Sequence, residues 1–61
     1  MKYKEIPAAL LKIMADRQSY QVTDLHSKIP VKREYINRHL HLMTMTGEVQ
    51  RVLFGVYRRA E

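Results

Sequence analysis

The sequence predicts an α+β domain in which three helices precede a short C-terminal β-hairpin. Apolar residues recur at helical spacing in three segments that are separated by turn-forming residues. After the last of these segments, two runs rich in β-branched and aromatic residues flank a glycine, a pattern typical of a hairpin. The chain has 61 residues without an internal repeat or a low-complexity segment, so residues 1–61 are expected to form a single domain.

The first helix is expected to run from about Pro7 to Arg17. Proline suits the first helical turn because an N–H group at that position has no intrahelical partner. Leu10, Leu11 and Met14 fall on one face of this helix and are expected to face the core.

A short second helix is expected from about Asp24 to Lys28, with Thr23 as its N-cap. Pro30 ends this helix because its ring favours extended backbone at Ile29. The preceding residues 19–22 contain an aromatic and a β-branched residue, and they form either an extended connector or a small strand.

The third helix is expected to run from about Lys32 to Thr46. Ile36, Leu40 and Met43 are spaced i, i+4 and i+7, which places them on one apolar face. Gly47 follows as a natural C-terminal stop.

The two hairpin strands are expected at residues 49–53 and 56–59, on either side of Phe54 and Gly55. Since so small a domain buries only about 60% of the surface that its unfolded chain exposes, we expect one shared core. Its predicted members are Leu10, Leu11, Met14, Leu25, Ile29, Ile36, Leu40, Met43 and Val49.

The formal net charge is +5, and the positive charge is concentrated in the second half of the chain. Residues 28–59 hold seven basic and two acidic side chains, whereas residues 1–27 hold four basic and three acidic ones. A basic surface of this kind attracts polyanions, although the same charges can also serve only to keep a protein soluble.

Cysteine is absent, which excludes a disulfide and a thiolate metal site and agrees with a reducing cytoplasm. No apolar run approaches the roughly 20 residues that span a bilayer, and the N-terminus lacks the apolar stretch of a signal peptide. The protein is therefore expected to be soluble and cytoplasmic.

Catalytic and metal-binding functions find little support in the sequence. No serine has evident histidine and acidic partners, and the two glycines form no phosphate-binding loop. His39 and His41 point to different faces of the third helix, while His26 lies on another helix. We therefore expect no enzyme activity, no cofactor and no bound metal.

The segment from Val31 to Arg51 shows a specific order of residue types. An apolar residue opens a turn, polar residues begin a helix, and a β-branched residue is followed two positions on by an arginine. Two apolar positions then precede a glycine, an apolar residue and a second arginine. The residues at these places are Val31, Lys32, Arg33, Ile36, Arg38, Leu40, Met43, Gly47, Val49 and Arg51.

This order resembles the recognition-helix region of winged helix-turn-helix DNA-binding regulators. The chain length and the Gly-x-Val-Gln-Arg sequence at residues 47–51 are similar to those of the small regulators of fimbrial operons. The resemblance implies a transcriptional regulator that binds double-stranded DNA sequence-specifically, with the third helix in the major groove and the hairpin, or wing, on the backbone. The wing is short here, and Tyr35 stands where a small hydroxyl residue is common.

The chemistry of the third helix and the hairpin points to the same function. Arg33, Asn37 and Arg38 are candidates for base recognition, because Arg pairs with guanine and Asn with adenine through two hydrogen bonds. Lys32 and Tyr35 suit contacts with phosphate or sugar. The predicted DNA-binding residues are Lys32, Arg33, Tyr35, Asn37, Arg38, His41, Arg51, Arg58 and Arg59.

Other interpretations stay open at this point. A helix with basic and polar residues on one face is commonly a solvated surface, and it is the arginines of the hairpin that favour DNA binding. A winged helix can also be a protein-interaction module, or a fragment of a larger replication or recombination protein. A DNA-binding protein this small would act as a homodimer or beside a larger DNA-binding protein. Exposed apolar side chains that would favour a protein partner are Leu42, Met45, Leu53 and Phe54.

Overall fold

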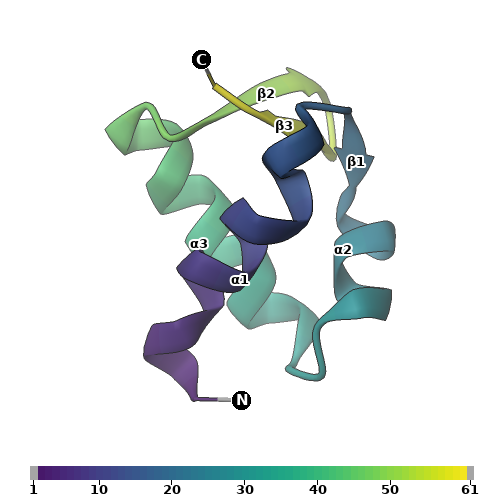
Figure 1. Ribbon diagram of the computed structural model, residues 1–61. Coiled ribbons are helices and arrows are strands. Elements are labelled where there is room, and N and C mark those ends of the chain that lie inside the picture. Colours follow the sequence, from purple (N-terminus) through teal and green to yellow (C-terminus); the bar gives the residue numbers. More distant parts are fainter. Residues whose placement is uncertain (1, 61) are drawn as a thin grey trace.

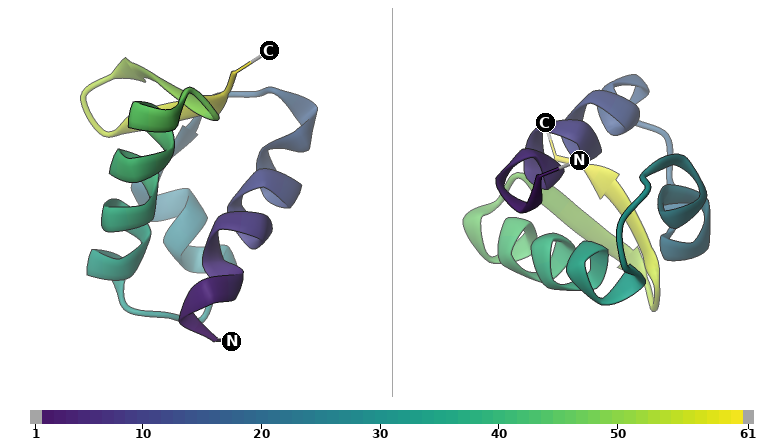
Figure 2. Two further views of the ribbon diagram at one scale, coloured as in Figure 1. Left: turned by 90° about the vertical axis from the view of Figure 1, so that its left-hand side faces the viewer. Right: turned by 90° about the horizontal axis from the view of Figure 1, so that it is seen from below.

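The computed structural model describes residues 2–60, and within them it confirms the α+β fold class. A three-stranded antiparallel sheet lies across one end of the helices, and the described chain begins near the other end (Figures 1 and 2). In chain order the elements, with η for a 3₁₀ helix, are η1 (Tyr3–Glu5), α1 (Ile6–Ile13), η2 (Met14–Asp16), β1 (Tyr20–Gln21), α2 (Val22–Lys28), α3 (Arg33–Thr46), β2 (Val49–Leu53) and β3 (Val56–Arg59).

The first helix is shorter than expected at its C-terminal end. α1 ends at Ile13, and the chain tightens into the 3₁₀ turn η2 before it reaches Arg17. Arg17 takes the left-handed conformation with φ 61°, and its N–H group donates to the Met14 carbonyl at 3.0 Å. This reversal lets the chain leave the helix and enter the sheet at Tyr20.

The residues before α2 form a small strand, and the predicted N-cap of α2 is wrong. β1 pairs with β3 through Tyr20 with Tyr57 and Gln21 with Val56. α2 then begins at Val22, so that Gln21 rather than Thr23 is its N-cap. The physical reason is the burial of Val22, which turns into the core directly from the strand.

α3 and the hairpin follow the sequence prediction closely. α3 runs from Arg33, one residue after the predicted start, and Gly47 ends it with φ 86°. The Glu48 N–H group donates to the Met43 carbonyl at 2.9 Å, which closes the last turn. β2 and β3 pair from Val49 opposite Arg59 to Leu53 opposite Val56.

One core joins the helices to the sheet. Eight of the nine predicted core residues are buried, whereas Leu11 is only half-buried at the edge of the core. His39 is also buried, and its Nδ1 atom donates to the Tyr35 carbonyl at 2.9 Å. The buried apolar residues are Ile6, Leu10, Met14, Val22, Leu25, Ile29, Ile36, Leu40, Met43 and Val49.

Candidate nucleic-acid interface

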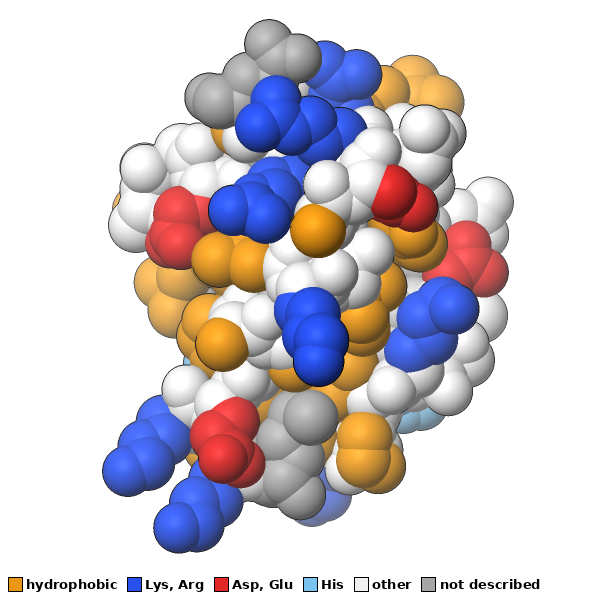
Figure 3. Space-filling view, viewed as in Figure 1, with side chains coloured by type: hydrophobic (Ala, Val, Ile, Leu, Met, Phe, Trp, Pro, Cys, Tyr) orange, Lys and Arg blue, Asp and Glu red, His pale blue; other side chains and the backbone are white. Residues whose placement is uncertain are grey.

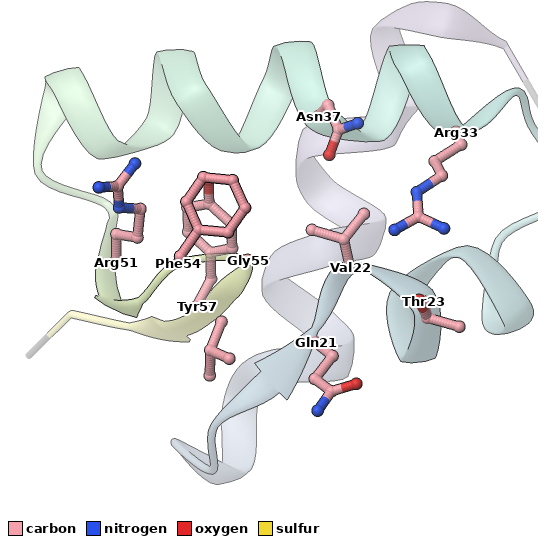
Figure 4. A pocket seen from close by; sticks show the side chains of 10 residues that line it. Gln21, Val22, Thr23, Arg33, Asn37, Arg51, Phe54, Gly55 and Tyr57 are labelled. Atoms are coloured by element: carbon pink, nitrogen blue, oxygen red, sulfur yellow. The ribbon is translucent and has the colours of Figure 1, made fainter.

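Three of the predicted DNA-binding residues meet in one open hollow between α3, the start of α2 and the hairpin. They are Arg33 and Asn37 of α3 and Arg51 of β2 (Figure 4). We call this feature the α3–hairpin hollow; its volume is about 570 Å³. The residues that line it are Gln21, Val22, Thr23, Arg33, Asn37, Arg51, Phe54, Gly55, Val56 and Tyr57.

Helical spacing places Arg33 and Asn37 together. They are one turn apart, and the buried residues Ile36 and Leu40 hold the adjacent face of α3 against the core. Figure 4 shows both side chains projecting from α3 toward the side on which α2 begins. His41 lies one further turn along α3 and is exposed. The three polar side chains therefore follow one line along the helix.

Arg51 reaches the hollow because of the local geometry of β2. It pairs with Tyr57, and the register of the two strands shifts between Arg51 and Leu53. Such an irregularity bends the strand and changes the direction in which the neighbouring side chains point. The Arg51 guanidinium carbon lies 5.9 Å from the centre of the Phe54 ring, so a cation and an aromatic ring stand together at the hairpin.

Lys32 and Tyr35 lie in a different hollow. Lys32 is the N-cap of α3, and its Nζ atom is 6.0 Å from the centre of the Tyr35 ring. Tyr35 packs edge-on against Tyr3, with 5.2 Å between ring centres. Together with His26 and Val31 these residues line a hollow between the N-terminal ends of α1 and α3 and the C-terminal end of α2. The structure therefore separates this pair from Arg33 and Asn37.

Arg38 contacts the N-terminal segment. Its Nη1 atom donates to the Tyr3 hydroxyl oxygen at 3.4 Å. This hydrogen bond is the main reason that the pKa of Arg38 lies above its ordinary value. Arg38 is exposed but does not line the α3–hairpin hollow.

Arg58 and Arg59 are neighbours in β3, but they serve opposite faces of the sheet because side chains alternate along a strand. Arg58 pairs with Gln50, and the two line a hollow between the hairpin and the C-terminal end of α3, together with Thr44. Arg59 is half-buried, and its Nη1 atom donates to the Leu11 carbonyl at 3.5 Å. Arg59 therefore ties the sheet to α1.

The view in Figure 3 shows where positive charge gathers on one face of the molecule. Several Lys and Arg side chains gather at the end that carries the sheet, and others are spread over the middle of this face and the opposite end, with acidic side chains between them. None of the residues that line the α3–hairpin hollow is acidic. The hollow therefore has a positive lining, which suits an anionic partner.

Sequence reasoning missed the contribution of the β1–α2 junction to this hollow. Gln21, Val22 and Thr23 reach it because β1 pairs with β3, so the hairpin comes against the start of α2. The Val22 N–H group donates to the Gly55 carbonyl at 3.2 Å. The available signal was the β-prone character of residues 20–22, but the partners of Tyr20 and Gln21 lie 37 and 35 positions further along the chain.

Comparisons with known proteins agree with this fold. No protein-family model matches the chain, and no curated protein matches it. Its structure is similar to the solution structure of a DNA binding protein from Sulfolobus islandicus, with a TM-score of 0.79. The two are 19% identical, and the match covers 93% of this chain and 95% of that one. The chain therefore has an α+β, winged-helix-like fold.

Within residues 2–60, no group of three His, Asp or Glu side chains is placed to hold a metal ion. None of the helices in that range has the length and apolar character to cross a membrane.

Proposed function

We propose that this protein binds double-stranded DNA sequence-specifically and acts as a small transcriptional regulator in the cytoplasm, without enzymatic activity. The observation that carries the proposal is the α3–hairpin hollow, where Arg33 and Asn37 of the third helix lie beside Arg51 of the hairpin. A similar fold in a DNA binding protein from Sulfolobus islandicus supports it.

In this proposal α3 lies in the major groove. The helix has 14 residues, hence a length of about 21 Å, and a groove about 12 Å wide admits it. Arg33 then pairs with guanine and Asn37 with adenine. Each such two-bond contact distinguishes the correct base from a wrong one by about 1–3 kcal/mol.

Phosphate contacts hold the protein in register. Arg51 contacts the backbone beside the groove, while Lys32 and Arg58 contact flanking phosphates. Arg59 plays a structural part, since its guanidinium already donates to the Leu11 carbonyl. With three phosphate contacts, affinity should fall about 40-fold when salt is raised from about 50 mM to about 200 mM.

The test begins with duplexes selected from a random pool and measures their affinity at the two salt concentrations. Asn37→Ala should weaken the selected duplex about tenfold and leave unrelated duplexes almost unaffected. Lys12→Gln is the matched control, because Lys12 is an exposed residue of α1. Absence of binding at low salt, or affinity that is indifferent to salt, would contradict the proposal.

A second copy of the chain, or a larger DNA-binding protein, would supply the additional contacts that a regulator of this size needs. Analytical ultracentrifugation with and without duplex distinguishes the two. A homodimer predicts two copies per bound duplex and a target with two half-sites about one helical turn apart.

The alternative function is a protein-interaction module that does not contact DNA. Leu42 and Met45 favour it, because these apolar side chains of α3 are 49% and 72% exposed. Capture from a nuclease-treated lysate separates the two functions. A protein partner would remain bound after the nucleic acid is removed, whereas a DNA-mediated association would be lost.

A further inference from the structure

The hairpin ends in a run of exposed apolar side chains. Val52, Leu53 and Phe54 are 45%, 67% and 92% exposed, and they follow one another in the sequence. Hairpin turns usually carry Gly, Asn, Asp or Ser, which suit a turn that is exposed to water. Single exposed apolar residues are ordinary, but three in succession at the end of a hairpin, two in β2 and one in the turn, are typical of a surface that contacts a ligand.

This hairpin tip is held firmly by the rest of the fold. The Val22 N–H group of α2 donates to the Gly55 carbonyl at 3.2 Å, and β3 pairs with β1 as far as Val56. Gly55 completes the turn with φ 75°, which glycine adopts without strain. Because the backbone is already ordered, placing Phe54 in a ligand costs little conformational entropy.

The surroundings of the tip favour a polyanion that also offers flat apolar faces. The Arg51 guanidinium lies 5.9 Å from the Phe54 ring centre, and Arg33 lines the same hollow. No acidic side chain is among the residues of this hollow. A stacked base step flanked by phosphates combines the two properties, since the rings are apolar and the backbone is negative.

We propose that Phe54 inserts as a wedge between two base pairs in the minor groove and kinks the duplex there. This inference rests on the proposed function and deepens it, because it defines the preferred DNA as one that bends easily. Arg51 holds the phosphate beside the wedge, while α3 occupies the adjacent major groove. Pyrimidine–purine steps such as TA and CA unstack most readily, so they are the expected insertion points.

The experiment places the fluorescent base 2-aminopurine at successive positions of a duplex that the protein has been shown to bind. Unstacking raises the fluorescence of this base. Wild-type protein should raise it at one pyrimidine–purine step, and energy transfer between dyes on the duplex ends should report a bend of roughly 20–90°. Phe54→Ala should abolish the fluorescence rise, reduce the bend, and weaken binding about tenfold.

Two controls separate a wedge from a change in folding. Phe54→Trp keeps a flat ring and should restore both the fluorescence rise and the bend. Lys12→Gln, on α1, should behave as wild type. Because the Phe54 side chain is 92% exposed, its replacement should leave the circular dichroism spectrum unchanged.

The remaining outcomes overturn the wedge in distinguishable ways. Salt-dependent duplex binding without a local fluorescence rise, or with a rise that survives in Phe54→Ala, would leave the proposed function standing and remove the wedge. Phe54-dependent binding of single strands but not of duplexes would replace both with a single-strand stacking function. Absence of any nucleic-acid binding would remove both.

Discussion

A hydrogen bond between the side chains of Tyr20 and Asp16 joins β1 to the end of η2. The Tyr20 hydroxyl donates to Asp16 Oδ2 at 2.7 Å, and the Gln18 N–H group donates to Asp16 Oδ1 at 3.0 Å. The bond from Gln18, followed by that from Tyr20, lowers the pKa of Asp16 below its ordinary value of 3.8. The same contact with Asp16 raises the pKa of Tyr20 above 10.0.

These shifts predict how stability changes with pH. A lowered carboxyl pKa contributes stability above pH 3.8, and that contribution is lost as the pH falls through the folded-state value. Asp16→Asn should therefore lower the free energy of unfolding at pH 7 and make little difference at pH 2. Urea unfolding of both proteins at the two pH values measures this. A difference that does not change with pH would contradict the prediction.

Base recognition by α3 can be tested one side chain at a time. Arg33→Ala should relax the preference for one base pair of the target, because it removes a contact with a base edge. Arg58→Ala should weaken all duplexes about equally and reduce the slope of log affinity against log salt by about one. Competition among duplexes that differ at one base pair distinguishes the two variants. An equal effect of Arg33→Ala on every duplex would show that Arg33 contacts only the backbone.

Gly47 determines where α3 stops. It ends α3 in the left-handed conformation with φ 86°, where a side chain is strained even though nothing lies within 4 Å of the position for a Cβ atom. Gly47→Ala should cost about 1 kcal/mol and lower Tm by about 4–8 °C. Gly47→Asn is the control and should cost less, because Asn enters this conformation more readily. Equal melting temperatures for wild type and Gly47→Ala would refute the strain argument.

The elements that the sequence predicted best are those specified by local signals. α3 has an apolar stripe at helical spacing and ends at a glycine, so both of its boundaries were predicted to within one residue. β1 has only a weak local signal, the β-prone character of residues 20–22, because a strand of two residues exists only through its pairing with β3. The N-cap of α2 was misassigned because the local preference of Thr23 yielded to the burial of Val22.

For the candidate site, too, the sequence predicted what depends on local spacing but not what depends on pairing between strands. The turn spacing of Arg33 and Asn37 on α3 was accessible from the sequence, and their meeting with Arg51 followed from the expected hairpin. The different surroundings of Arg58 and Arg59 depend on strand register, which the Phe54-Gly55 turn does not specify strongly. Sequence patterns therefore identified the basic residues but did not assign each to a face.

At the scale of the whole molecule, stability and DNA binding are expected to be linked. A folded domain has about 0.05–0.15 kcal/mol of stability per residue, which for a chain of this size amounts to roughly 3–9 kcal/mol. Leu40 is fully buried between the helices, and Leu40→Ala should cost about 2–5 kcal/mol. Much of the variant should therefore unfold at temperatures that the wild type tolerates.

Duplex DNA should restore the folded state of this variant, because a ligand that binds only folded protein stabilises it. Free duplex at about 100 times its Kd should add about 2.7 kcal/mol to the free energy of unfolding. Thermal melts of Leu40→Ala with and without the selected duplex measure the rise in Tm. The double variant Leu40→Ala/Asn37→Ala should recover much less with the same duplex concentration, because Asn37 is exposed and contributes to binding rather than to the core. Equal recovery of both variants would mean that the stabilisation comes from unspecific charge and not from the surface of α3.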